Sequence, residues 1–210
     1  MIEALQHFIN GKKIAGSNNR FGEVFNPSTG SIEKSCPLAT ANEVNLAADV
    51  AAEAGFKWGK ASQKTRREVI FGMRELVKRD SAKLAEIVSI EHGKSSKDAM
   101  GEVGRALETI EYAACANELT KGQFSVNIGG NIDNFSVQLP LGVVGCIVPF
   151  NFPLLVPLLT SAMAVACGNS VIMKPSEKVP SAALKLAELW QEAGLPDGVW
   201  NVVNGDKEAV

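Results

Sequence analysis

The chain has 210 residues, of which 46% are hydrophobic and 21% are charged, as is ordinary for a soluble globular protein. The formal net charge is only −2, so no nucleic acid or membrane surface is expected as a partner, and a small molecule or another protein is favoured. The four cysteines and two histidines include no CxxC pair and no closely spaced set of zinc ligands, so we expect no metal.

The cytoplasm is the expected location. Four cysteines in a chain of this size do not suggest a disulfide framework, and free thiols fit a reducing compartment. The segment from Met1 to Gly11 lacks a basic region followed by an apolar run, so no secretory signal is expected. Asn134 to Met173 is uncharged, but prolines and glycines divide it into pieces well short of the ~20 residues of a membrane span.

The first 37 residues are predicted to form short strands and turns. The pair Asn10-Gly11 is typical of a two-residue hairpin turn, and Asn26 to Gly30 has the composition of a turn.

Four helices follow in the prediction, and their apolar stripes indicate helical scaffolding around a core. Thr40 and Glu43 form a capping box at the start of the first helix. Ser81 is the expected N-cap of the third. The predicted extents of the last three helices are about Gln63 to Arg79, Ser81 to Gly93 and Ser96 to Leu119.

Apolar and polar residues alternate between Phe124 and Leu139. Phe124 to Ile128 and Phe135 to Leu139 each follow this pattern, and Gly129-Gly130-Asn131 lies between them. A β-hairpin is predicted, with one face solvated or paired to another element.

The last part of the chain predicts a βαβαβ unit, because strands that alternate with helices of this length favour a parallel sheet with right-handed crossovers. The third strand is expected to be an unpaired apolar edge, which suggests a fragment of a larger sheet. The predicted strands are Gly142 to Val148, Ser170 to Lys174 and Val199 to Val203, and the helices are Leu154 to Cys167 and Ser181 to Ala193.

Ligands bind open parallel sheets beyond the carboxyl ends of the strands, near helix N-termini. No G-x-G-x-x-G motif is found there, so the common dinucleotide fingerprint is missing. Lys174 and Glu177 can bind a phosphate or a ribose diol, although a lysine at a strand end is more often a solvated surface residue. Asn151 alone is more often a turn residue or a helix cap.

Six segments, taken together, resemble the aldehyde dehydrogenase superfamily. They occur in family order over nearly the whole chain, and the set is highly specific although each segment is weak alone. Within the superfamily, the CoA-acylating methylmalonate-semialdehyde dehydrogenase branch is most similar. The basis is Glu91 to Lys94 leading into Gly101 to Arg105, phenylalanine rather than tryptophan at Phe150, and Pro175 to Lys178. The six segments are Asn26 to Gly30, Glu91 to Lys94, Pro140 to Gly145, Pro149 to Pro153, Lys174 to Glu177 and Gly194 to Gly205.

The resemblance implies roles for particular residues. Asn151 would direct its side-chain amide at the developing oxyanion. Lys174 and Glu177 would hold the adenosine ribose of NAD, Lys178 would flank them, and Gly205 would let the backbone approach the adenine. The other implied cofactor-binding residues are Ile147, Val148, Pro149 and Phe150.

The implied fold is α/β, with a truncated Rossmann-like cofactor domain. Residues 1–123 would be the helical part of that domain, 124–139 a β-hairpin arm of the oligomerisation domain, and 140–210 the first part of the NAD-binding sheet. The chain would be the N-terminal part of a longer family member, and the catalytic domain would be absent from it. A homo-oligomer, dimer or tetramer, is implied for the full-length protein.

The implied reaction oxidises a small semialdehyde to an acyl-CoA through a cysteine thioester, with NAD as cofactor and CoA as co-substrate. The nucleophilic cysteine would lie past residue 210, so the chain alone is expected to be inactive. Leu159 to Ala162 departs from the branch near the expected substrate channel, which leaves a succinate-semialdehyde dehydrogenase as an alternative. A non-catalytic nucleotide-binding or assembly fragment is a further alternative. Glu177 favours NAD over NADP by repelling a 2′-phosphate, but Lys178 offsets this preference.

Overall fold

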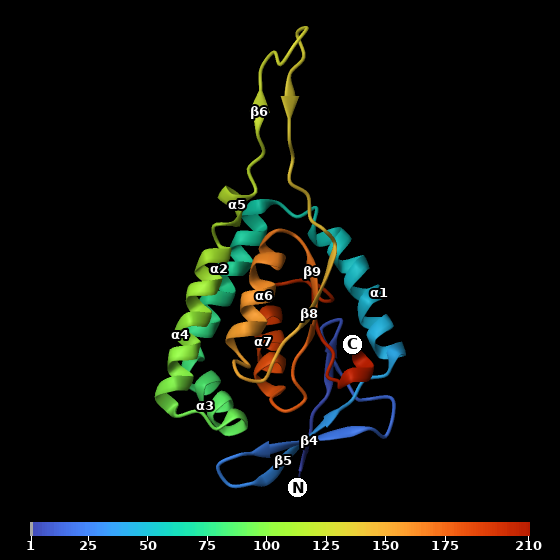
Figure 1. Ribbon diagram of the computed structural model, residues 1–210, viewed down its shortest axis with the longest axis vertical. Coiled ribbons are helices and arrows are strands. Elements are labelled where there is room, and N and C mark those ends of the chain that lie inside the picture. The colour runs from blue at the N-terminus through green and yellow to red at the C-terminus, as the bar shows by residue number, and fades with distance from the viewer. Residues whose placement is uncertain (1) are drawn as a thin grey trace.

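The computed structural model describes residues 2–210, and a five-stranded mixed sheet lies at its centre (Figure 1). Three strands run parallel: β8 (Val143–Ile147), β9 (Ser170–Lys174) and β10 (Trp200–Val202). From the N-terminus, β2 (His7–Ile9) pairs antiparallel with β10, and β3 (Lys12–Ile14) pairs antiparallel with β2. The predicted βαβαβ unit is therefore confirmed, and two N-terminal strands extend its sheet.

The prediction that the third parallel strand is a sheet edge is wrong. β10 lies between β9 and β2, because the sheet order is β3-β2-β10-β9-β8. The open edge of the parallel part is β8, where Val143 is 41% and Ile147 is 61% exposed. The unpaired apolar edge thus exists, at the opposite side of the three parallel strands.

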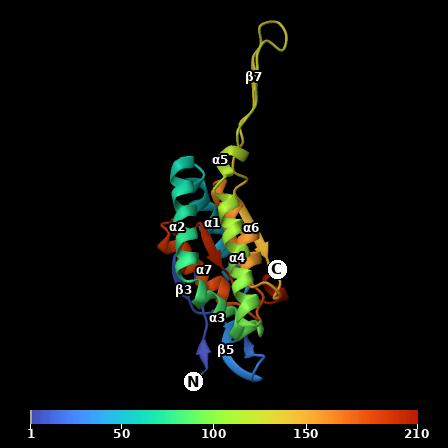
Figure 2. The same ribbon diagram turned by 90° about the vertical axis from the view of Figure 1, so that its left-hand side faces the viewer.

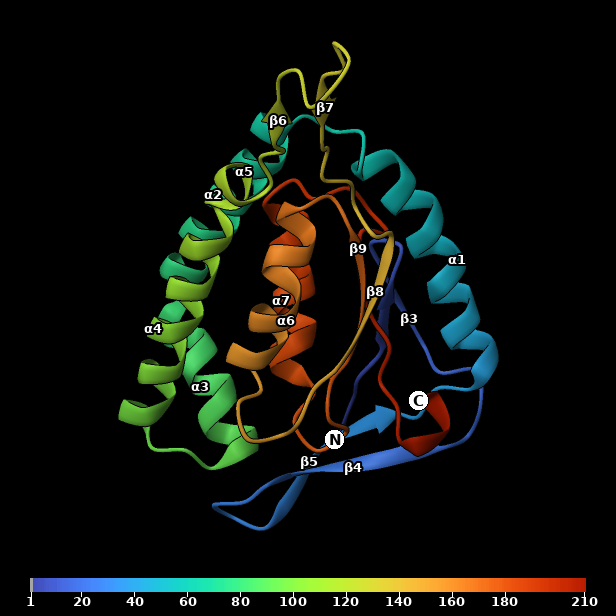
Figure 3. The same ribbon diagram turned by 45° about the horizontal axis from the view of Figure 1, so that its top comes forward.

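Helices cover the two faces of the sheet in separate layers (Figure 3). On one face, α1 (Ala41–Trp58) packs against β8, β9 and β10. The crossover helices α6 (Leu155–Ala166) and α7 (Ser181–Glu192) both pack on the other face. Two consecutive right-handed crossovers in the same direction place their helices on one side of a sheet.

An outer layer of helices covers α6 and α7. It consists of α2 (Gln63–Arg79), α3 (Ser81–His92) and α4 (Ser96–Ala113), whose apolar stripes face inward. A short helix, α5 (Ala116–Leu119), follows α4, so the single helix predicted to reach Leu119 is interrupted near Cys115. The largest side chains enclosed by these layers include Ile70, Met73, Leu84, Ile110, Leu158 and Trp190.

Of the predicted helix caps, one capping box and one glycine C-cap are confirmed, and one N-cap is not. Thr40 and Glu43 form the expected capping box, and Gly93 ends α3 with a left-handed φ of 81°. Ser81 is not the N-cap of α3: Asp80 occupies that position and makes no side-chain capping hydrogen bond. Asp80 also ends α2, so the two helices share one linking residue and leave no room for a separate cap.

A small N-terminal sheet lies beside the carboxyl ends of the parallel strands (Figure 1). Its strands are β1 (Glu3–Ala4), β4 (Phe21–Asn26) and β5 (Ser31–Pro37), in the order β1-β5-β4. The hairpin turn between β2 and β3 is formed by Asn10-Gly11 with φ of 53° and 69°, as its composition predicts.

The predicted hairpin between the helical layer and β8 projects away from the body as a narrow arm (Figure 2). Its paired strands, β6 (Phe124–Ser125) and β7 (Asn134–Phe135), are shorter than predicted, because the arm leaves the layers that would support a longer ladder. Its exposed apolar residues are Phe124, Val126, Ile128, Ile132, Phe135, Val137 and Leu139. Among residues 2–210, no helix combines the length and apolar character needed to cross a membrane.

Candidate functional site

The carboxyl ends of β8, β9 and β10 carry three loops on the same side of the sheet, facing the small N-terminal sheet (Figure 1). The loop after β8 contains Asn151, the loop after β9 contains Glu177, and the loop after β10 contains Gly205. The sheet therefore gathers the predicted site residues at one edge, where open parallel sheets bind their ligands.

Asn151 has a free side chain on a fixed backbone. The residue is exposed, and its side-chain amide has no hydrogen bond to any other described residue of the chain. Its backbone carbonyl accepts a hydrogen bond of 2.7 Å from Lys94 Nζ. The side-chain amide can therefore donate to a ligand without first breaking an internal contact.

The loop after β8 is closed by a carboxylate from the outer helical layer. Glu102 on α4 is fully buried, and its Oε1 accepts from the backbone N–H groups of Leu154 and Leu155, at 2.8 and 3.0 Å. Its Oε2 pairs with Lys94 Nζ at 2.5 Å. A negative charge at a helix N-terminus is stabilised by the free N–H groups there, so Glu102 caps α6 from another helix.

The N-terminus of α7 is closed in the same manner. Glu91 at the end of α3 accepts from Ser181 N at 3.0 Å and from the Ser181 hydroxyl, and it pairs with Lys34 Nζ at 2.9 Å. Helix N-termini beside a parallel sheet are usual phosphate sites. In this chain the N-termini of α6 and α7 are already occupied by internal carboxylates.

Phe150 forms one wall of a cleft beside this loop. Its ring is 52% exposed and stacks on His92, with ring centroids 6.4 Å apart and an interplanar angle of 25°. Lys178 Nζ lies 5.5 Å from the centre of the same ring. Burial and the neighbouring Lys94 lower the pKa of His92, and Glu102 opposes this shift. The lowered pKa favours the neutral ring. The cleft measures about 380 Å³, and its lining includes Phe25, Pro27, His92, Phe150 and Lys178.

Lys174, at the end of β9, is more buried than its predicted ligand role suggests. It is only 8% exposed, and its Nζ donates to the carbonyls of Gly205 at 2.7 Å and Pro175 at 2.9 Å. Glu177 Oε2 lies 4.0 Å from the same Nζ. Burial lowers the pKa of Lys174, and Glu177 opposes that shift. An ammonium group has three donors, so one remains after the two carbonyls are satisfied.

The remaining predicted cofactor residues lie on the same edge. Val148 is buried and its N–H donates to Lys174 O at 3.1 Å, whereas Ile147 is exposed at the open side of β8. Gly205 is buried, and a side chain there would collide with Ala209. Glycine at this position thus has a packing reason of its own.

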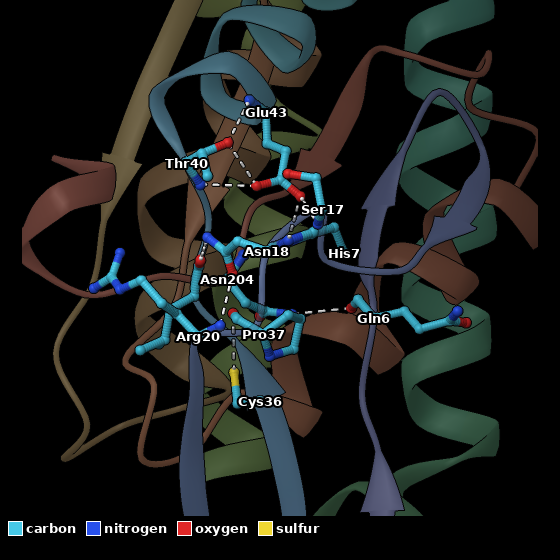
Figure 4. A network of polar contacts seen from close by, with 11 residues as sticks. Gln6, His7, Ser17, Asn18, Arg20, Cys36, Pro37, Thr40, Glu43 and Asn204 are labelled. Atoms are coloured by element: carbon cyan, nitrogen blue, oxygen red, sulfur yellow. Dashed lines mark hydrogen bonds and ion pairs between the residues drawn. The ribbon is translucent and has the colours of Figure 1, made fainter.

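A buried polar network holds the loop after β10 against the N-terminus (Figure 4). The backbone N–H of Asn204 donates to His7 Nδ1 at 3.1 Å, and its side-chain nitrogen donates to Gln6 O at 2.9 Å. His7 Nε2 lies 3.5 Å from Glu43 Oε1, at ion-pair distance but without hydrogen-bond geometry. Because Nδ1 accepts, the proton of the neutral ring sits on Nε2. The capping box of α1 and the Gly205 loop are therefore parts of one network.

Sequence reasoning missed Glu102 and Glu91 as site-forming residues. The available signal was a charged residue within an apolar helical stripe: Glu102 lies among Ala99, Val103 and Ala106, which are all buried. A buried carboxylate at such a position requires partners, and these come from helix ends that are remote in the sequence.

The four cysteines lie within the described residues, and none forms a disulfide. Burial raises the pKa of Cys36 to about 12 and also raises the pKa values of Cys146 and Cys167. A thiol with a raised pKa is a poor nucleophile at neutral pH. Residues 2–210 contain no cluster of three or more His, Cys, Asp or Glu side chains arranged for a metal ion.

His7 predicts a dependence of stability on pH. Burial lowers its pKa below the ordinary 6.5, against the opposing effect of Glu43, so the folded chain binds this proton less readily than the unfolded chain. The contribution to the free energy of unfolding is fully present above pH 6.5 and is lost as the pH falls below it, by at most about 1.4 kcal/mol per pH unit. Urea denaturation at several pH values between about 5 and 8 measures this slope.

The control for this prediction is His7→Asn, which can still accept from Asn204 N–H but does not titrate. It is expected to flatten the profile in the same pH range. Equal slopes in the two proteins would contradict the assignment to His7.

A parallel sheet flanked by crossover helices, with polar loops gathered at its carboxyl edge, defines an α/β domain of the kind that presents ligand sites at that edge. The family model for the aldehyde dehydrogenase family matches residues 14–210. The chain belongs to the aldehyde dehydrogenase family, and the resemblance predicted from its motifs is confirmed.

Three relatives that this chain resembles along nearly its whole length carry the names of semialdehyde dehydrogenases. A malonate-semialdehyde dehydrogenase of Pseudomonas aeruginosa is 47% identical over 206 residues, which are 98% of this chain and 41% of that protein. The structure of methylmalonate-semialdehyde dehydrogenase from Oceanimonas doudoroffii matches 99% of this chain and 42% of its own, with 46% identity and a TM-score of 0.96. A protein assigned as methylmalonate-semialdehyde dehydrogenase from Sinorhizobium meliloti 1021, complexed with NAD, matches 100% of this chain and 43% of its own, with 42% identity and a TM-score of 0.98. The chain thus spans about two-fifths of the length of these relatives.

Proposed function

We propose that this chain forms the cofactor-facing part of an NAD-dependent malonate- or methylmalonate-semialdehyde dehydrogenase. The observation that carries the proposal is the free side-chain amide of Asn151, held on an anchored backbone at the carboxyl edge of the sheet. The names of the relatives, and the NAD bound to the Sinorhizobium meliloti protein, support the substrate class and the cofactor.

In this proposal Asn151 stabilises negative charge on the aldehyde oxygen. A thiolate, supplied from outside this chain, adds to the carbonyl carbon, and the oxygen gains charge as the tetrahedral adduct forms. An amide donor already aimed at that oxygen stabilises the adduct more than the aldehyde. Bound NAD supplies the hydride acceptor for the oxidation.

The proposed cofactor contacts use donors and acceptors that remain available at the site. The third donor of Lys174 and the carboxylate of Glu177 would bind the ribose hydroxyls of the adenosine, with Lys178 nearby. Phe150 lines the cleft, Ile147, Val148 and Pro149 would contact the cofactor beside it, and Gly205 would flank the adenine. The carboxylates that close α6 and α7 would keep the pyrophosphate away from those helix ends, so its support would come from another segment.

CoA is the proposed acyl acceptor, and a homo-oligomer is the proposed assembly. The exposed apolar residues of the hairpin arm support the assembly, because a narrow arm of this kind gains stability by packing against another subunit. The alternative of a non-catalytic assembly fragment rests on the same arm. Succinate semialdehyde remains the alternative substrate.

The test is aldehyde-dependent NADH formation by a protein that carries this chain at the full length of its relatives. Malonate and methylmalonate semialdehyde are expected to give NADH in the presence of CoA, and the acyl-CoA product can be measured by mass spectrometry. Absence of NADH with both substrates would contradict the proposal. A free carboxylate product in place of acyl-CoA would show that CoA is not the acyl acceptor. A preference for succinate semialdehyde over the other two aldehydes would favour the alternative substrate.

A parallel experiment uses the 210-residue chain alone. We expect no aldehyde-dependent NADH from it, because the nucleophilic cysteine implied by the family lies past residue 210. Burial raises the pKa values of Cys36, Cys146 and Cys167, and the exposed Cys115 lies at the start of α5, away from the carboxyl edge of the sheet (Figure 1). Titration calorimetry with NAD, alongside the elution volume, measures whether its cleft binds the cofactor. Tight binding by a compact chain would favour the nucleotide-binding fragment.

A further inference from the structure

We infer that Lys94 and Glu102 are positioning residues for Asn151: a buried ion pair in the outer helical layer that sets the direction of the catalytic amide. This inference rests on the proposed role of Asn151. Both side chains are largely buried and bind the loop that follows β8, so each would act through that loop.

The pair fixes this loop at three points. Lys94 Nζ donates to Asn151 O at 2.7 Å, and Glu102 Oε1 accepts from Leu154 N and Leu155 N. Lys94 Nζ also lies 4.0 Å from the centre of the Phe152 ring. The backbone is therefore held at Asn151 itself and again three and four residues later, which fixes the direction in which the Asn151 side chain leaves the backbone.

Stability of the fold alone does not require a charged pair at this position. The side chains of Lys94 and Glu102 are 13% and 0% exposed, and removing two charges from water carries a desolvation cost that apolar residues of similar size would avoid. A neutral side chain with an amide oxygen could accept from the same N–H groups of α6 without burying a charge. What the ammonium adds is a donor for the carbonyl of Asn151, and Glu102 compensates its charge.

A second ion pair provides a matched comparison within the same chain. Lys34 and Glu91 cap α7 as Lys94 and Glu102 cap α6, and both glutamate side chains are almost fully buried. The difference is the other contact of the lysine. Lys34 Nζ donates to the Ser181 hydroxyl, whereas Lys94 Nζ donates to the carbonyl of Asn151.

Two charge-balanced double variants separate positioning from folding. Lys94→Met/Glu102→Gln removes both charges, keeps the lysine stem and leaves an amide oxygen to cap α6, so no unpaired charge is buried. Lys34→Met/Glu91→Gln makes the same change at α7. Both are made in the protein of full family length, and thermal unfolding confirms that each folds.

The first readout is the pre-steady-state rate of NADH formation. We expect Lys94→Met/Glu102→Gln to lower this rate by about 10- to 100-fold with little change in the KM for aldehyde, because small misplacements of a catalytic group have effects of this size. Lys34→Met/Glu91→Gln alters Glu91, which closes α7 at the same edge of the sheet, so it is compared at saturating NAD and is expected to lose much less of this rate. An unchanged rate in the first variant, or equal losses in both, would overturn the inference.

The second readout is hydrogen exchange, which does not depend on activity. The first variant is expected to speed exchange of the amides of Leu154 and Leu155, which donate to Glu102, and the second to speed exchange at Ser181 instead. If the parent protein makes no NADH from any aldehyde, the proposed function fails, and exchange still tests the anchoring. Unaltered exchange at Leu154 and Leu155 in Lys94→Met/Glu102→Gln would overturn the inference whatever the activity.

Discussion

Replacing Asn151 by alanine is expected to lower aldehyde-dependent NADH formation by about 100- to 1000-fold in the protein of full family length. The exposed amide of Asn151 has no internal partner among the described residues, and its backbone is held by Lys94. Its loss therefore removes a donor from the transition state while disturbing little of the fold. Stopped-flow absorbance of NADH in the first turnover measures the effect directly.

Two controls define this result. Asn117→Ala changes an asparagine on α5, at the end of the molecule opposite the loops (Figure 1), and is expected to react at the parental rate. NAD affinity of Asn151→Ala, measured by calorimetry, is expected to stay close to that of the parent, because the loss lies in the chemical step. A first-turnover rate equal to that of the parent would remove Asn151 from the proposed mechanism.

Replacing Lys174 by methionine is expected to weaken NAD binding by about 10- to 100-fold and to destabilise the fold, since hydrogen bonds to a charged group are each worth about 1.5–3 kcal/mol. The variant leaves the carbonyls of Gly205 and Pro175 without their buried donor, and it removes the ammonium from the proposed ribose contact. Calorimetry with NAD and thermal unfolding measure the two effects separately.

Lys178→Met is the matched control, because Lys178 is an exposed lysine four residues later in the same loop region. It is expected to unfold at the parental temperature and to bind NAD with a much smaller loss. If Lys174→Met destabilised the fold but bound NAD as tightly as the parent, Lys174 would be a structural residue only.

The helices and parallel strands could be predicted from the sequence because their patterns are local. An apolar stripe places α2 at Gln63–Arg79, and the apolar run places β9 at Ser170–Lys174, both with the predicted bounds. The pairing of β2 with β10 could not be predicted in this way. It joins a three-residue strand near the N-terminus to a strand close to the other end of the chain, and neither pattern specifies a partner.

For the candidate site, too, the sequence could predict the residues near strand ends but not the contacts that depend on packing. Asn151 and Lys174 follow strand ends, so a rule of parallel sheets points to their region, and the family motifs supply their proposed roles. The contacts of Lys174 depend on where the backbone turns after β10, and those of Glu102 depend on how α4 lies over α6. Such contacts are properties of the packed layers, and short sequence patterns do not encode them.

The position of β2 inside the sheet has a consequence for synthesis on the ribosome. His7 and Asn204, which form a hydrogen bond, are separated by 197 residues along the chain. The strand β2 therefore emerges long before the strand β10 with which it pairs. Pairings this remote form slowly, and a strand awaiting its partner is prone to associate with other chains. Until β10 emerges, the apolar face of this N-terminal strand is a natural substrate for chaperones.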